Sequence, residues 1–188
     1  FLSACSNNVP TSDDIDPAGD DGETENPTKQ FGILTYTGNS TTGQSLTGLG
    51  FKPDLIWAKM SSSSQNNQLY DSSRLNSRNT PFMLRSDTTG AEEDDQSTGN
   101  NNEIISSFDT DGFTLGTSGS GPNDNTREYV AWCWRANGGT TSSNTDGSIT
   151  STVQANTKAG FSIITYTGTG SNATIVLGLS AKLEFFNI

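Results

Sequence analysis

Residues able to bind a metal ion are grouped most closely in the stretch Asp109-Thr110-Asp111-Gly112. Alternating aspartates form half of a calcium-binding loop. However, Ca²⁺ takes roughly six to eight oxygen ligands, and the glutamate that closes an EF-hand loop is absent downstream. Asp-Gly is also a favoured two-residue turn between antiparallel strands. We therefore predict a hairpin turn here, with a structural Ca²⁺ site at Asp109 and Asp111 as the alternative, and no other cofactor.

Groups suited to acid–base catalysis are few. The sequence contains no histidine, which removes the commonest general base and metal ligand. Carboxylates such as Glu103 and Glu128 could serve a glycosidase, but no spacing places two of them across one cleft. Nucleophile-elbow, P-loop and zinc-binding spacings are also missing from the sequence. We predict no catalytic residues, so a polysaccharide-active enzyme is the least favoured of three functional classes.

The charge of the chain excludes one class of partner. The formal net charge is −11, and Lys and Arg do not cluster anywhere in the 188 residues. A nucleic-acid-binding protein needs such cations to replace the counterions of the phosphates, so we exclude nucleic acid as a partner. No apolar run approaches the roughly 18 residues of a membrane-spanning helix.

The first residues resemble a membrane attachment signal. Leu2-Ser3-Ala4-Cys5 is similar to the lipobox of bacterial lipoproteins, in which the cysteine thiol is acylated. Residues 6–30 carry seven acidic side chains and a single lysine, a composition that predicts a disordered acidic tether. We therefore expect contact with a membrane only through a lipid on Cys5. An ordinary, unmodified terminus is the alternative.

From Phe31 to Trp134 the pattern changes to short strands. Stretches such as "FGILTYTG" and "REYVAWCWRANG" alternate in side-chain direction and are separated by Gly, Asn and Asp turns. No helical periodicity occurs, so we predict an all-β fold, an antiparallel β-sandwich or jelly roll. Apolar residues on both sides of a strand favour burial, although aromatic rings can also serve as sugar platforms. We expect these aromatic residues to form the core: Phe31, Trp57, Phe82, Phe113, Trp132 and Trp134.

One phrase occurs twice. "FGILTYTG" at 31–38 returns as "FSIITYTG" at 161–168, with six of eight residues identical. This repeat predicts four segments: a lipobox-like start and acidic linker (1–30), a sandwich domain (31–137), a Gly/Ser/Thr-rich connector (138–160) and the start of an incomplete second repeat (161–188). Completion of a neighbouring sheet by the last segment is the alternative.

Longer stretches carry a family resemblance. "GFKPDLIWAKM", "SFDTDGFTLG" and "YVAWCWRANGGTTSSNTDGSITSTVQANTKAGFSIITYTG" resemble a tandemly repeated sandwich domain of marine phage structural proteins and environmental bacterial surface proteins. The resemblance covers 31–179 and implies a concanavalin- or laminin-G-like, lectin-like fold without catalytic residues. "GLSAKLEFFNI" departs from the family pattern, because it lacks the second Gly and the Pro that usually open a unit.

The resemblance also implies a function. We expect a non-catalytic adhesion module at the cell surface or outside the cell, similar to an outer-membrane lipoprotein, that recognises a carbohydrate or another envelope component. A virion or tail-fibre structural module is the alternative. A homo-oligomer or a neighbouring tandem repeat is the expected protein partner, and the residues that bind a ligand are not identified at this level.

Overall fold

The computed structural model describes residues 27–94, 105–116 and 121–179. These residues form one short 3₁₀ turn and eleven strands. In chain order the elements are η2 (Pro27–Lys29), β1 (Phe31–Thr37), β2 (Gln44–Thr47), β3 (Leu55–Met60), β4 (Gln68–Leu75), β5 (Pro81–Arg85), β6 (Ile105–Asp109), β7 (Gly112–Leu115), β8 (Glu128–Trp134), β9 (Ser142–Asn144), β10 (Ser151–Asn156) and β11 (Phe161–Tyr166). Within these ranges, no helix is long and apolar enough to cross a membrane.

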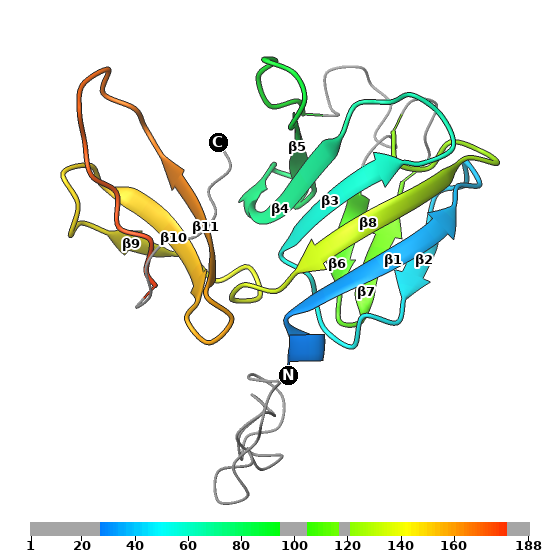
Figure 1. The fold of residues 1–188 in the computed structure, drawn as a ribbon, viewed down its shortest axis with the longest axis horizontal. Helices are drawn as coiled ribbons and strands as arrows, with labels where there is room; N and C mark the ends of the chain where they lie inside the picture. Colours follow the sequence, from blue (N-terminus) through cyan, green and yellow to red (C-terminus); the bar gives the residue numbers. More distant parts are fainter. Residues whose placement is uncertain (1–26, 95–104, 117–120, 180–188) are drawn as a thin grey trace, which may run out of the picture.

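The first eight strands form two antiparallel sheets. The larger sheet has the order β1-β8-β3-β4-β5, and the smaller has the order β2-β7-β6. Figure 1 shows the smaller sheet behind the larger one, so that the two make the layers of a sandwich. The prediction of an all-β antiparallel sandwich is confirmed.

Strand alternation places one set of side chains between the two layers. Ile56 and Ala58 of β3 belong to one buried cluster with Phe113 and Leu115 of β7. Phe113 is fully buried, and such burial stabilises a fold by about 1.5–3 kcal/mol relative to an exposed ring. The core therefore lies between the sheets, on the inner face of the larger sheet.

The expected aromatic core is wrong for most of its members. Only Phe113 belongs to the buried cluster, whereas Phe31 is 39% exposed. Trp57, Trp132 and Trp134 alternate with the buried residues of β3 and β8, so they lie half-buried on the opposite, outer face of the larger sheet. Phe82 is likewise half-buried between two buried residues of β5. Alternation distinguishes the two faces of a strand, but both faces are apolar here, and only one is covered by the second sheet.

A third antiparallel sheet, with the order β11-β10-β9, lies beside the sandwich (Figure 1). Strands β9 and β10 fall within residues 138–160, which we expected to act as a connector. The repeated phrase forms β11, which pairs with β10 from Phe161↔Asn156 to Tyr166↔Ser151. The second copy of the phrase thus lies in a small sheet of its own, whereas β1 pairs with β8.

Buried polar groups join this third sheet to the sandwich. The Asp54 side chain, just before β3, is fully buried, and its Oδ1 accepts a hydrogen bond from the Ser72 hydroxyl at 2.7 Å. Its Oδ2 accepts from the backbone N–H groups of Ala136 at 2.7 Å and Gly138 at 2.9 Å. The carboxylate therefore holds the turn that follows β8.

Gln154 of β10 contacts the same turn from the other side. This fully buried side chain accepts through Oε1 from the backbone N–H groups of Asn137 at 3.1 Å and Gly139 at 2.8 Å. Its Nε2 donates to the Ser73 hydroxyl of β4 at 2.8 Å. A fully satisfied buried network specifies one arrangement, so these bonds set the direction in which the third sheet leaves the sandwich.

Candidate binding site

An open groove of about 450 Å³ lies along β1, which is an edge strand of the larger sheet. Its size is within the range of roughly 300–1,000 Å³ that is usual for small-ligand sites. One wall comes from η2 and the start of β1, and the other from the turn before β3. The lining residues are Thr28, Lys29, Phe31, Gly32, Ile33, Gly48, Leu49 and Gly50.

The second wall is a glycine turn held by a carboxylate. Gly48 has φ of +108° and Gly50 has φ of +71°, a left-handed region that glycine adopts without the strain of a side chain. Asp111 accepts hydrogen bonds from the N–H groups of both glycines, at 3.1 Å from Gly48. Across the groove, the Lys29 ammonium donates to the Gly50 carbonyl oxygen at 3.1 Å. The shape of the groove thus depends on Asp111 and on the two glycines.

The second predicted metal ligand also has partners within the protein. Asp109 accepts hydrogen bonds from the hydroxyls of Ser107 at 2.8 Å and Thr114 at 2.6 Å. Asp109 pairs with Gly112 at the β6–β7 hairpin, so the predicted hairpin turn forms, but its two central residues are Thr110 and Asp111, and Gly112 is already the first residue of β7. In the part of the chain that the structure describes, no three His, Cys, Asp or Glu side chains are grouped so as to hold a metal ion.

One aromatic ring, that of Phe31, lines the groove. The ring of Phe31 packs against Trp134 with centroids 5.1 Å apart, and Trp134 stacks in turn on Phe161 of β11 at 6.2 Å. Ile33, one pleat further along β1, is 53% exposed. Phe31 is therefore supported from behind and still presents part of its surface to solvent.

The outer face of the larger sheet continues from the groove as an apolar row. Register pairs Ile33 with Trp132, Trp132 with Trp57, Trp57 with Leu69, and Leu69 with Leu84, so that one residue comes from each of the five strands. The indole rings of Trp57 and Trp132 lie 5.8 Å apart. We call these five residues the outer apolar row. Ile33 is exposed and the other four are half-buried, so part of this apolar face is open to solvent.

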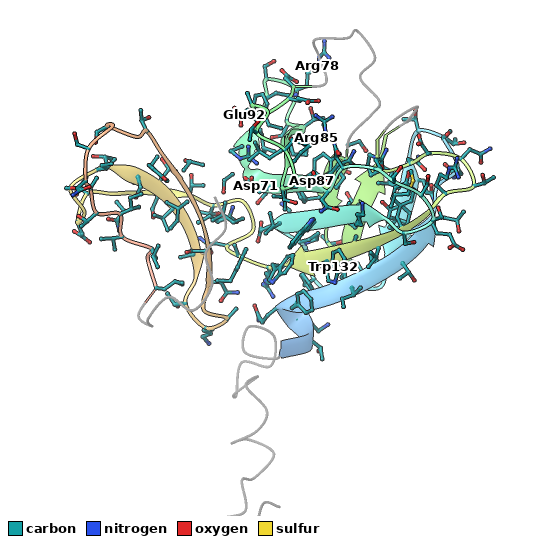
Figure 2. The ribbon with its side chains drawn as sticks, turned by 45° about the horizontal axis from the view of Figure 1, so that its top comes forward. Asp71, Arg78, Arg85, Asp87, Glu92 and Trp132 are labelled. Atoms are coloured by element: carbon teal, nitrogen blue, oxygen red, sulfur yellow. The ribbon has the colours of Figure 1, made fainter. Side chains whose placement is uncertain are left out.

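Charged side chains gather elsewhere, around β4 and β5 (Figure 2). Arg74 forms ion pairs with Asp71 at 2.6 Å and with Glu92 at 2.7 Å, while Arg85 pairs with Glu93. Asp71 also accepts hydrogen bonds from the backbone of the strand that carries it. These pairs join β4, through Arg74, and β5, through Arg85, to the segment after β5, and we assign them a structural role.

The polar and thiol groups of the inner face are held in their neutral forms. Burial raises the pKa of Tyr129 from its ordinary value of 10.0 to about 12 and that of Cys133 from 9.0 to about 12. Desolvation likewise places the pKa of Tyr36 well above its ordinary value. A thiol with a pKa of about 12 is a poor nucleophile at neutral pH, so Cys133 serves packing. Cys5, the predicted site of lipid attachment, lies outside the described residues.

Sequence patterns did not identify the groove. Its residues come from two segments about twenty positions apart, and the signals present were the Gly-Leu-Gly turn and the single lysine of the N-terminal region. Each signal has an ordinary structural explanation when considered alone. The folded chain brings Lys29 to Gly50 and Phe31 to Trp134, and these contacts define the site.

The fold and the groove together define an antiparallel β-sandwich domain with an aromatic-edged surface site. Residues 26–188 match the family described as a domain of unknown function, DUF7483, and the chain belongs to this family. No curated protein and no solved structure matched the chain.

Proposed function

We propose that the domain is a non-catalytic binding module of a cell surface, and that it binds a glycan in the groove beside β1. The observation that carries this proposal is the partly exposed ring of Phe31, which lines an open groove together with Lys29. A sugar has one apolar face and several hydroxyl groups, and the groove offers matching chemistry to both.

Each group of the groove has a separate role in this proposal. The apolar face of a sugar ring packs on Phe31, whose position is held by Trp134. The Lys29 ammonium carries three donor hydrogens and directs one to Gly50, so the others are available to sugar oxygens. The absence of side chains at Gly48 and Gly50 lets a ligand approach the backbone closely.

The groove that we propose as a glycan site lacks the usual catalytic side chains among its described lining residues. Among the described residues that line it, none is Asp, Glu, His or Cys, which are the usual acids, bases and strong nucleophiles. A glycosidase would need two carboxylates facing each other across the bound sugar. The lining therefore favours binding without turnover.

The test is affinity measured on a panel of polysaccharides with matched aromatic variants. Phe31→Ala should weaken binding about tenfold, equivalent to about 1.4 kcal/mol, because the stacking surface is lost. Phe82→Ala is the control, since Phe82 lies on β5 at the opposite edge of the same sheet. Equal affinity of both variants and the native chain, or no binding to any polysaccharide, would exclude the groove as a glycan site.

A structural module of a virion or tail fibre is the second candidate. The outer apolar row favours it, because a flat apolar surface suits contact with another protein better than contact with a sugar. Detection of the protein in purified phage particles by mass spectrometry would support this role. Its presence only in bacterial envelopes would support the first proposal.

We also propose a lipid anchor at Cys5, on the basis of the lipobox-like sequence. Cells that express the full-length protein should incorporate a palmitate analogue into it, and Cys5→Ala should abolish that labelling. Cys133→Ala is the matched control, because Cys133 is buried in the core. Labelling that persists in Cys5→Ala would remove the anchor from the proposal.

A further inference from the structure

Strand β11 repeats most of the sequence of β1 but has different neighbours. β1 pairs with β8 across seven residue pairs, whereas β11, among the described residues, pairs with β10 only. Both are edge strands of their sheets. The repeat also extends past the strands, because Gly48-Leu49 returns as Gly178-Leu179 at the same offset of 130 positions. The surroundings of β1 and of β11 place different demands on the repeated residues.

The repeated tyrosine is packed against other aromatic rings in the first copy and is exposed in the second. The Tyr36 hydroxyl donates to the Pro122 carbonyl oxygen at 2.9 Å, and its ring stacks on Tyr129 with centroids 5.1 Å apart. It also meets the edge of Phe113 at 6.3 Å. Tyr166, its equivalent in β11, is 42% exposed. β11 thus carries a core-facing aromatic residue that its own small sheet leaves at the surface.

The repeated glycine gives the sharper contrast. A Cβ added at Gly38 would lie 2.2 Å from the Asp124 carbonyl oxygen, which is far inside van der Waals contact, so the site beside β8 accepts glycine only. A Cβ added at Gly168 would meet nothing within 4 Å. A glycine is thus needed at this position of the repeat beside β8, but the surroundings of residue 168 would accept a larger residue.

We propose that β11 is the first strand of a second sandwich of the same fold, where the edge that does not pair with β10 pairs with a β8-type strand. The partner is a second copy of this domain that lacks its own first strand. Backbone hydrogen bonds of an added edge strand supply affinity, while Tyr166 and Gly168 supply the match to the site. Ser162 replaces Gly32, and its Cβ would press on the mobile end of Leu49 at 2.7 Å, which requires a small shift.

The buried hydrogen bonds of Gln154 to the turn after β8 fix the orientation of β11 relative to the first sandwich. Gln154 lies on β10, directly beside β11, and is bonded to the turn after β8. Phe161, the first residue of β11, stacks on Trp134 of the first sandwich. Two successive sandwiches would therefore meet at a set angle. This assembly surface is distinct from the glycan groove and does not depend on it.

A tandem chain tests the inference with the complete protein. The chain 1–188 is followed directly by a second copy of residues 39–160, so that β11 of the first copy is the only strand of this type left to the second sandwich. Unfolding enthalpy scales with the number of folded residues, so calorimetry should give a value well above that of the single chain and approaching about twice that value. The control is two complete chains joined by a flexible Gly-Ser linker, which should also give about twice that value. A tandem chain that stays at the single-chain enthalpy while the control doubles would overturn the inference.

A single substitution makes the test specific. Gly168→Ala should leave the melting temperature of the single chain and of the linker control unchanged, because open space surrounds residue 168. In the tandem chain the same substitution should remove the second transition, because the added methyl would press on the carbonyl oxygen equivalent to that of Asp124. An unaltered second transition in Gly168→Ala would show that β11 does not occupy the β1 site, and would also overturn the inference.

Discussion

Replacement of Asp54 by alanine is the strongest test of how the third sheet is held. The carboxylate is fully buried and accepts hydrogen bonds from the backbone N–H groups of Ala136 and Gly138 and from the Ser72 hydroxyl. Asp54→Ala removes all three acceptor contacts at once. The two N–H groups then have no acceptor side chain, whereas Ser72 keeps its contact with Gln154.

The expected magnitude follows from these partners. A buried donor left without an acceptor costs about 1–3 kcal/mol, so two backbone donors cost about 2–6 kcal/mol. This is a large share of the roughly 5–15 kcal/mol that stabilises a typical domain. Asp87→Ala is the matched control. Asp87 is exposed and accepts from the Asn67 N–H at 3.1 Å, so water can replace its carboxylate with a loss of less than about 1 kcal/mol.

Urea denaturation followed by tryptophan fluorescence measures both variants. The free energy of unfolding falls linearly with urea concentration, and the variants are compared only if the slope of this line is the same. A changed slope would signal a change in the compactness of the unfolded or native state. Addition of Gln154→Ala to Asp54→Ala should cost less than the sum of the single losses, because both side chains hold the turn at 136–139. A loss in Asp54→Ala no greater than that in Asp87→Ala would refute the role assigned to the buried carboxylate.

Two further predictions concern pH and metal. Tyr129 and Cys133 have pKa values of about 12 in the folded protein, above their ordinary values of 10.0 and 9.0. The unfolded chain thus loses these protons first, and stability should be constant below about pH 9 and fall from there toward pH 12. Urea midpoints measured at successive pH values check this, and a flat profile would contradict it. Because Asp109 and Asp111 accept hydrogen bonds within the protein, EDTA should leave the melting temperature unchanged; a lower midpoint in EDTA would support a bound Ca²⁺.

Local patterns were sufficient to predict the fold class and strands such as β1 and β8, but not β9 and β10, which form where a connector was expected. The alternation in β8 separates Ala131 and Cys133 from Trp132 and Trp134, and the structure keeps that division. The hairpin turn between β6 and β7 was also predictable from the Asp-Gly pattern, although its central residues are Thr110 and Asp111. The repeat at 161–168 is a property of the sequence that any comparison of the two segments reveals.

The candidate site was not predictable from the same patterns. Phe31 was expected in the core because it alternates with other apolar residues, yet it edges a surface groove. Which face of an apolar strand is covered depends on where the second sheet packs, and that is decided by contacts between residues distant in sequence. Lys29 and Gly50 likewise meet only in the folded chain.

The sequence by itself determined that the chain forms antiparallel strands, because side-chain alternation and turn residues act over a few positions. Tertiary structure alone decided that the tryptophans lie half-buried on the outer face of the larger sheet, and that Asp54 and Gln154 hold the turn that leads to the third sheet. It also decided that a side chain would clash at residue 38 but not at residue 168. The physical reason is that burial and hydrogen bonding depend on contacts between residues that are distant in sequence. A local sequence pattern does not indicate which distant residue will be the partner.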